Sequence, residues 1–259
     1  MNASSGRWIA ASRDILDRIE HTQMGAISEA AVRCATTIGA GGLVHLFGTG
    51  HSRIPLEEMF PRYGSFPGFH PMAELSMTFH TQIVGVNGQR QAMFIERVEG
   101  LAEAILDNFE FGPDDMMIVF SAGGRTAVPI EMAAGARKRG LGVVAVTAVE
   151  QSMAVESEHP SGLRLLDHAD VVIDLCVPVG DALVTLDGLD TPVGPGSTVA
   201  NTAIVNEIKV QTAELLIAAG AMTPVITSSA IVGPQRAAEL FDAAYGEHAR
   251  RYAAVLATT

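Results

Sequence analysis

The sequence predicts an α/β fold in which helices cover both faces of a buried parallel sheet. Only 5% of the 259 residues are aromatic, whereas Ala, Val, Ile and Gly are abundant, as in helices packed closely on a parallel sheet. Short apolar runs also alternate with helical stretches along the chain. Because no repeat or long linker divides the chain, we predict one domain over residues 1–259, with a core over about 40–228 and flanking helices.

The elements follow from the periodicity of apolar residues. Residues 8–38 read as one helix, because Ile15, Ile19, Ile27 and Cys34 keep a spacing near 3.6 residues and glycines follow Ile38. Buried strands are expected at residues 43–48, 116–120, 142–147, 171–175 and 224–227. Further helices are expected at residues 99–108, 127–139, 197–219 and 234–256.

Charge and cysteine content exclude several classes of protein. The net charge of −12 argues against nucleic acid as a partner, because phosphate-backbone binding depends on Lys and Arg. Cys34 and Cys176 stand far apart without a C-x-x-C pattern, which argues against a disulfide framework or zinc site. The first residues lack the apolar run of a signal peptide, and no long apolar stretch follows. We therefore expect a cytoplasmic protein that does not bind membranes.

Two loops carry the pattern of an anion site. Gly48-Thr49-Gly50-His51-Ser52 follows the first predicted strand, and Ser121-Ala122-Gly123-Gly124-Arg125-Thr126 follows the second. In an open parallel sheet, ligands bind where strands end and helices begin, and helix N-termini there attract anions. Either loop alone could be only a turn with an N-cap. The presence of two such loops favours binding.

The loops favour a single phosphate on a small molecule. The dinucleotide pattern G-x-G-x-x-G fails at Arg53, the Walker pattern is absent, and neither loop contains lysine. A third candidate contact is Ser197-Thr198, which follows a Gly-Pro-Gly turn at the start of a long predicted helix. Those hydroxyls are equally well explained as a helix cap.

The segments FGTGHS, FSAGGRT with VPIEMA, HPSG and PVGPGST resemble the sugar isomerase (SIS) domain superfamily, most closely an uncharacterised bacterial family of phosphosugar isomerase-like proteins. The resemblance implies a five-stranded parallel sheet in a three-layer αβα sandwich of Rossmann-like type. It also implies binding of a phosphorylated sugar in a site often completed by a second subunit, hence a homodimer or homotetramer. More distantly, the segments at Glu58 and Glu99 are similar to those that supply the two acid/base glutamates of N-acetylmuramic acid 6-phosphate etherase.

The chain departs from the superfamily pattern at two positions. Gly123 stands where the superfamily loop usually has a second serine, so one phosphate-binding hydroxyl is missing. Arg53 stands where the relatives usually carry histidine. Ligand affinity or identity is therefore expected to differ from that of the relatives.

Isomerisation or elimination at a sugar needs groups that remove and deliver protons. The candidates are Glu58, Glu74, Glu96, Glu99, His51 and His80. We assign proton transfer to Glu58 and Glu99, assisted by His51 or His80. Either glutamate could instead be a solvent-exposed residue on a helix face. His70, Glu74 and His80 match no dedicated metal-binding spacing, so we expect neither metal nor cofactor.

The sequence thus predicts an enzyme that binds a phosphorylated sugar and catalyses aldose–ketose isomerisation. The predicted binding residues are Gly48, Thr49, Gly50, Ser52, Ser121, Gly123, Gly124, Arg125, Thr126, Ser197 and Thr198. An etherase or lyase acting on a phosphorylated amino sugar shares the first proton abstraction and stays an alternative. A non-catalytic phosphosugar sensor is the alternative from another class.

Overall fold

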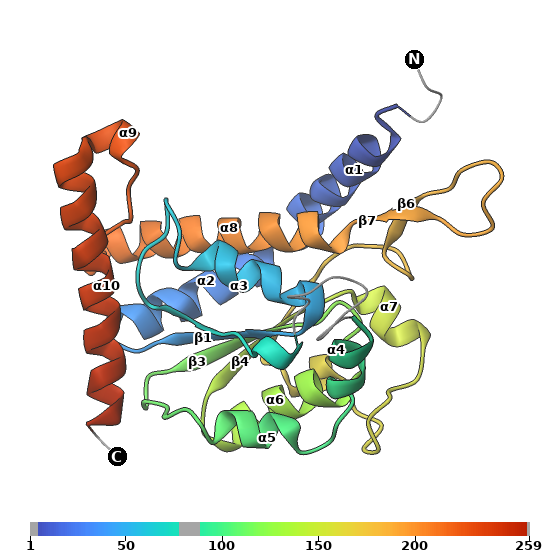
Figure 1. Cartoon of the computed structure of the whole chain (residues 1–259), viewed down its shortest axis with the longest axis horizontal. Coiled ribbons are helices and arrows are strands. Elements are labelled where there is room, and N and C mark those ends of the chain that lie inside the picture. The colour runs from blue at the N-terminus through green and yellow to red at the C-terminus, as the bar shows by residue number, and fades with distance from the viewer. Residues whose placement is uncertain (1–4, 78–88, 258–259) are drawn as a thin grey trace.

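The computed structural model describes residues 5–77 and 89–257, and a sheet of five parallel strands lies at its centre (Figure 1). The strand order is β2-β1-β3-β4-β5, and every pairing is parallel. The strands are β1 (Val44–Gly48), β2 (Phe69–Met72), β3 (Met116–Phe120), β4 (Gly142–Thr147) and β5 (Val171–Asp174). The predicted five-stranded α/β class is confirmed.

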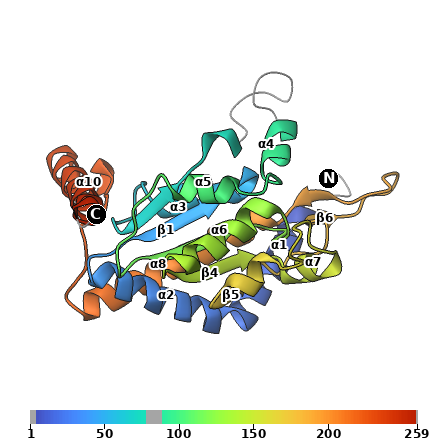
Figure 2. The same ribbon diagram turned by 90° about the horizontal axis from the view of Figure 1, so that it is seen from below.

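Helices cover both faces of the sheet, which makes three layers (Figures 1 and 2). Alternate strand residues such as Leu46 and Ile118 pack against α1 (Arg7–Thr22), α2 (Met24–Gly39), α3 (Ile54–Met59) and α8 (Ser197–Ala218). Their neighbours Phe47 and Val119 face α5 (Leu101–Leu106) and α6 (Ala127–Lys138). This alternation follows from the two-residue side-chain period of a strand, and both faces are apolar because both are covered.

The remaining elements lie around this body. They are η1 (Gly50–Arg53), η2 (Leu75–Met77), α4 (Gln89–Ile95), α7 (Val149–Ala154), η3 (Leu165–His168), β6 (Ala182–Val184), β7 (Val193–Pro195), α9 (Ser229–Val232) and α10 (Pro234–Leu256). Helix α10 crosses one end of the layered body, and the β6–β7 hairpin lies at the opposite end (Figures 1 and 2).

The single helix predicted over residues 8–38 is wrong, because two helices occupy that stretch. Gln23 (φ −109°, ψ −8°) is the single residue that separates α1 from α2. Its side-chain Oε1 accepts a hydrogen bond of 2.9 Å from the backbone N–H of Asp174 at the end of β5. Helix α2 packs along the sheet and α8, whereas α1 contacts α8 and β6. A bend at Gln23 lets the chain do both.

The strand predicted at residues 224–227 is also wrong, and the fifth strand is β2. Ile226 exchanges two backbone hydrogen bonds with Gly64 and Ser65 but joins no sheet. The place beside β1 belongs to Phe69–Met72. That segment contains Pro71, whose ring nitrogen cannot donate to a ladder, so it reads poorly as a strand. As an edge strand it tolerates the proline.

Helix α10 is fixed to the sheet through a cluster of histidines. His70 of β2 stacks on His248 and Tyr252 of α10, with ring centroids 5.2 and 5.0 Å apart. His70 Nδ1 and His248 Nε2 lie 3.0 Å apart. Beside them, His45 Nε2 pairs with the Asp115 carboxylate at 2.9 Å, fully out of solvent. The cluster therefore joins two strands to the last helix.

Acid is expected to weaken this cluster. Burial, chiefly, lowers the pKa of His70 and of His248 to about 4, with neighbouring imidazoles and, at His248, Arg251 acting in the same direction. Because these folded-state pKa values lie below the unfolded value near 6.5, the unfolded chain binds protons first as pH falls. The free energy of unfolding should fall by about 2–3 kcal/mol between pH 7 and pH 5.

Denaturant titrations at both pH values test this expectation. The variant His248→Gln should lose much of the acid-dependent decrease, whereas His21→Gln, at an exposed position of α1, should keep it. An equal decrease in the wild type and the His248 variant would assign the acid sensitivity to other groups.

No helix in residues 5–77 and 89–257 is both long and apolar enough to cross a bilayer.

Candidate functional site

The two glycine-containing loops meet at the carboxyl ends of β1 and β3. From β1 the chain continues to β2 on one side, while β3 lies on the other side of β1. Such a point, where the connections run in opposite directions, is where open parallel sheets bind ligands. A cavity of about 280 Å³ lies there, lined by both loops together with Gln89, Met93, Glu96, Arg97 and Gln151.

The first loop is held tightly against the end of β1. Gly48, the last residue of the strand, lies so near the turn that an added Cβ would stand 2.2 Å from the carbonyl oxygen of Ser52. The Ser52 N–H donates to the Thr49 carbonyl at 3.0 Å, which starts η1. Thr49, Gly50, His51 and Ser52 line the cavity. Glycine at position 48 thus permits the close approach that forms this wall.

The second loop presents unpaired backbone donors. The Ser121 hydroxyl accepts a hydrogen bond of 3.1 Å from the Gly124 N–H, and Gly124 has a left-handed φ of 61°. The amides of Ala122, Gly123 and Arg125 find no acceptor among the residues that the structure describes. Thr126 precedes α6 without capping it through its side chain. Unpaired N–H groups before a helix N-terminus are suited to an anion.

Glu96 is the carboxylate that lies between these loops. The Thr49 hydroxyl donates to Glu96 Oε2 at 2.9 Å, and the Val128 N–H of α6 donates to the Glu96 backbone carbonyl at 3.0 Å. Burial raises the pKa of Glu96 above its ordinary value, opposed by the Thr49 hydrogen bond and by Arg97. The first loop thus holds the Glu96 side chain, α6 holds its backbone, and the carboxylate is more basic than that of an exposed glutamate.

The structure places the two glutamates chosen from the sequence outside this cavity. Glu58 lines a larger, mostly apolar cavity of about 500 Å³ with Tyr63, Phe241 and Tyr245. It pairs with Arg62 and accepts a 2.9 Å hydrogen bond from Asn206 Nδ2. Glu99 is exposed and precedes α5, which begins only at Leu101, after the left-handed Gly100. His80 lies outside the described residues.

Ser197 and Thr198 are not among the residues that line the cavity. The Ser197 N–H and hydroxyl donate to Asp181 Oδ1 and Oδ2 at 2.7 and 2.6 Å. Asp181 itself adopts a left-handed φ of 66°. The carboxylate of Asp181 therefore occupies the N-terminus of α8 in place of an outside anion.

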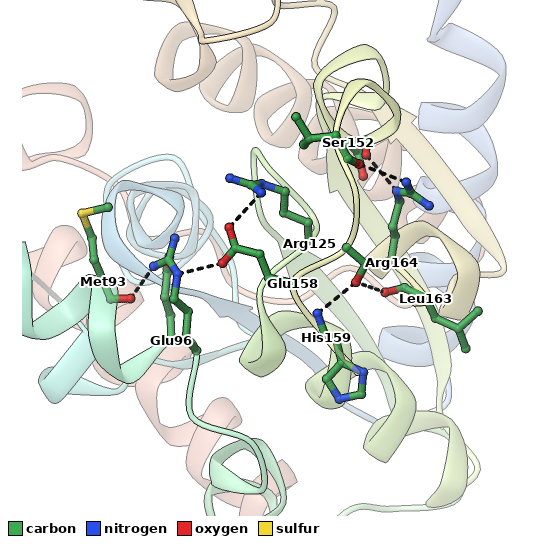
Figure 3. Close-up of polar contacts among 11 residues, drawn as sticks. Met93, Glu96, Arg125, Ser152, Glu158, His159, Leu163 and Arg164 are labelled. Atoms are coloured by element: carbon green, nitrogen blue, oxygen red, sulfur yellow. Dashed lines mark hydrogen bonds and ion pairs between the residues drawn. The ribbon is translucent and has the colours of Figure 1, made fainter. Parts of the chain in front are cut away.

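The HPSG segment, quoted from the sequence, forms a braced turn beside the site. His159 Nδ1 lies 2.7 Å from the Ser161 hydroxyl, and its Nε2 lies 3.3 Å from Glu131 of α6 (Figure 3 shows His159). The Ser157 hydroxyl donates to the Leu163 carbonyl at 2.6 Å. These contacts fix the segment that carries Glu158.

Sequence reasoning missed most residues contributed by α4 and the turn after it. Glu96 was one of several carboxylate candidates, whereas Arg97, Met93 and Gln89 carried no motif. The available signal was the position of Glu96 and Arg97 directly before Val98-Glu99-Gly100, the segment similar to an acid/base region. Which of these neighbours turns toward the loops depends on where α4 ends, and this is a tertiary property.

Comparison with known proteins gives a family match and full-length relatives. The family model described as the SIS domain matches residues 7–148. A UPF0309 protein of Streptomyces griseus is 32% identical, with 88% of this chain and 90% of the relative aligned. A UPF0309 protein of Oceanobacillus iheyensis is 34% identical, over 85% of this chain and 87% of the relative.

Among the solved structures that are similar to this chain, two phosphoheptose isomerases share much less of its sequence. A phosphoheptose isomerase from Francisella tularensis aligns with 79% of this chain and 94% of its own, at 15% identity and a TM-score of 0.49. The phosphoheptose isomerase GmhA from Neisseria gonorrhoeae aligns with 80% and 94%, at 14% identity and a TM-score of 0.47.

Proposed function

Because this chain belongs to the SIS domain family and, within it, to the UPF0309 proteins, we propose that it binds a phosphorylated sugar between its two glycine-containing loops and catalyses aldose–ketose isomerisation. The observation that carries the proposal is that one cavity brings together a half-buried carboxylate, Glu96, and backbone donors that have no acceptor among the described residues. A phosphate needs the donors, and proton transfer at carbon needs the carboxylate.

The phosphate is bound by uncharged groups in this proposal. Within residues 5–77 and 89–257 the amides of Ala122, Gly123 and Arg125 have no acceptor. Ser52, Ser121 and Thr126 line the same cavity and supply hydroxyl groups. The N-terminus of α6 adds a partial positive charge. Such a site holds one phosphate although the protein as a whole is acidic.

Glu96 carries the proton in this proposal. As a base it removes the proton from C2 of the open-chain aldose, and the same carboxyl group then delivers it to C1. The O2 hydroxyl proton is meanwhile transferred toward O1, so that the atoms balance and a ketose forms. Its raised pKa makes Glu96 a stronger base than an ordinary glutamate. His51 lines the same cavity and is positioned to assist the oxygen-to-oxygen transfer.

Proton exchange in deuterated water tests the proposal. Hexose, pentose, heptose and amino-sugar phosphates are incubated with the protein, and loss of the C2 hydrogen signal is followed by NMR. Exchange and ketose formation with at least one of them are expected. Binding of a sugar phosphate with no exchange for any of them would identify a sensor and overturn the catalytic part.

Gly123→Ser is expected to strengthen phosphosugar binding. The substitution restores the hydroxyl that the superfamily loop usually carries. An added Cβ would meet only Arg125 Cγ and Gln151 Nε2, both at 3.8 Å, so the serine fits without strain. One further hydrogen bond should add about 0.5–1.5 kcal/mol of binding free energy. Calorimetry with the best sugar phosphate measures it, with Gly123→Ala as the control that adds bulk alone.

We further propose that the chain forms a homodimer or homotetramer. The 500 Å³ cavity beside Glu58 is flanked by the half-exposed rings of Phe241 and Tyr245, and α8 exposes Val210 and Ile217. Apolar surface of this kind favours association. Light scattering at micromolar concentration should give at least a dimer, and a monomer would refute the proposal.

A further inference from the structure

A single carboxylate holds two arginines at the rim of the proposed phosphosugar site. Glu158 Oε1 pairs with Arg125 Nη1 at 2.8 Å (Figure 3). Glu158 Oε2 pairs with Arg97 Nε at 2.7 Å. The three residues come from separate segments: the turn after α4, the loop after β3 and the stretch after α7. Both arginines, but not Glu158, line the 280 Å³ cavity.

Further contacts fix the guanidinium group of Arg97 and the backbone of Arg125. The Glu158 N–H donates to the Arg125 carbonyl at 2.9 Å, so the two residues are joined through backbone and side chain. Arg97 Nη1 donates to the Met93 carbonyl and lies 3.2 Å from Glu96 Oε1. The arginines are thus oriented before any ligand arrives, which reduces the entropy lost on binding.

The stretch that carries Glu158 is braced independently of the cavity. Arg164 Nε donates to the Ser152 carbonyl at 2.8 Å, and its Nη2 donates to the Val155 carbonyl at 3.0 Å (Figure 3). Glu158 therefore acts as a fixed positioning residue for both arginines.

Donors remain on both arginines after these contacts. A guanidinium has five N–H groups. Of those on Arg125, only Nη1 has a partner among the described residues. Arg97 engages Nε and Nη1, and its Nη2 has no partner in the part of the chain that the structure describes. Arg97 and Arg125 face two carboxylates, Glu158 and Glu96, so the charges at the rim balance although the chain as a whole has a net charge of −12.

One phosphate does not account for these donors, because the loops already offer it uncharged N–H and O–H groups. Guanidinium groups suit planar carboxylates and phosphates, and the carboxylate of Glu158 bridges this very pair. We therefore propose that Arg97 and Arg125 bind a second anionic group of the ligand, a carboxylate or a second phosphate. This inference rests on the proposed phosphosugar function and narrows its substrate class to sugar phosphates with two anionic groups.

Calorimetry with matched pairs of ligands tests the inference at fixed ionic strength. The pairs are glucose 6-phosphate with 6-phosphogluconate, and fructose 6-phosphate with fructose 1,6-bisphosphate. The ligand with the second anionic group should bind at least about tenfold more tightly in one pair or both, as charge-assisted contacts allow. The pair that shows the preference identifies the second group as carboxylate or phosphate.

Arg97→Gln should abolish that preference and change the affinity for the monophosphate by less than about threefold, because only the contact to the second group is lost. Arg97→Lys should retain part of it. The control Arg33→Gln removes the same charge from the outer surface of α2, where Arg33 pairs with Glu29, and should leave the preference intact. Should Arg97→Gln fail to fold, as judged by thermal melting, Arg125→Gln takes its place.

Two outcomes overturn the inference while the proposed function survives. One is tight binding of a monophosphate without any preference for a second anionic group. The other is an equal loss of affinity for both members of a pair in Arg97→Gln, which would place Arg97 at the first phosphate. If no sugar phosphate of any kind binds, the proposed function fails and the inference fails with it.

Discussion

Replacing Glu96 by glutamine is expected to slow proton exchange at C2 of the bound sugar phosphate by about 10²–10⁴-fold, the usual cost of losing one general base. Binding of the same ligand should change little. Glutamine keeps the shape of the side chain and still accepts the 2.9 Å hydrogen bond from the Thr49 hydroxyl. It loses the ability to take up a proton, together with the negative charge that pairs with Arg97.

The pH dependence of exchange provides a second readout for Glu96. A general base acts when it is deprotonated, so the rate should rise with pH through the pKa of the base. Burial raises the pKa of Glu96, and the rising limb should therefore lie above the pH expected for an exposed glutamate. The limb should vanish in Glu96→Gln, whose residual exchange no longer depends on this group.

The glutamates chosen from the sequence supply the matched comparisons. Glu99→Gln alters an exposed residue outside the cavity and should leave exchange unchanged. Glu58→Gln alters the neighbouring cavity, where Glu58 pairs with Arg62 and Asn206. If Glu58→Gln abolishes exchange while Glu96→Gln retains it, the base belongs to α3 and the sugar extends into that second cavity.

Elements with strong local signals were predictable from the sequence. Strands β1, β3, β4 and β5 are short and mainly apolar, and α8 and α10 begin at a glycine turn and at Pro234. The meeting of the two loops also follows from a general rule, because the carboxyl ends of adjacent parallel strands share one edge. For these elements, residue composition and the glycine and proline residues at their ends were sufficient for the prediction.

The wrong predictions share one physical cause. Contacts between residues far apart in the sequence decide which of several locally possible structures a segment adopts. Gln23 interrupts a good helical period because its side chain bonds to the end of β5. Pro71 makes β2 read poorly as a strand in the sequence, although β2 pairs with β1 at the edge of the sheet. Asp181 takes the N-terminus of α8, which looked available to a phosphate. Glu96 differs from Glu99 mainly in the direction in which the turn after α4 points it. None of these partners is near in the sequence.

Gly48→Ala is expected to cause the largest loss of ligand binding among single substitutions in the loops. The added methyl group would stand 2.2 Å from the Ser52 carbonyl oxygen and 2.7 Å from the Ser52 carbonyl carbon. Both are backbone atoms, so no side chain can rotate away, and η1 as a whole must move. Overpacking of this kind costs about 1–3 kcal/mol of stability.

The displaced backbone is the wall that carries Thr49, Gly50 and Ser52, so binding of a sugar phosphate should fall by at least about tenfold when these donors lose their positions. Gly123→Ala is the matched control in the second loop, since its methyl group would meet nothing closer than 3.8 Å. Thermal melting and calorimetry of both variants separate the two effects. Normal binding by Gly48→Ala would mean that the first loop does not need this close approach, and the phosphate would then be assigned to the second loop alone.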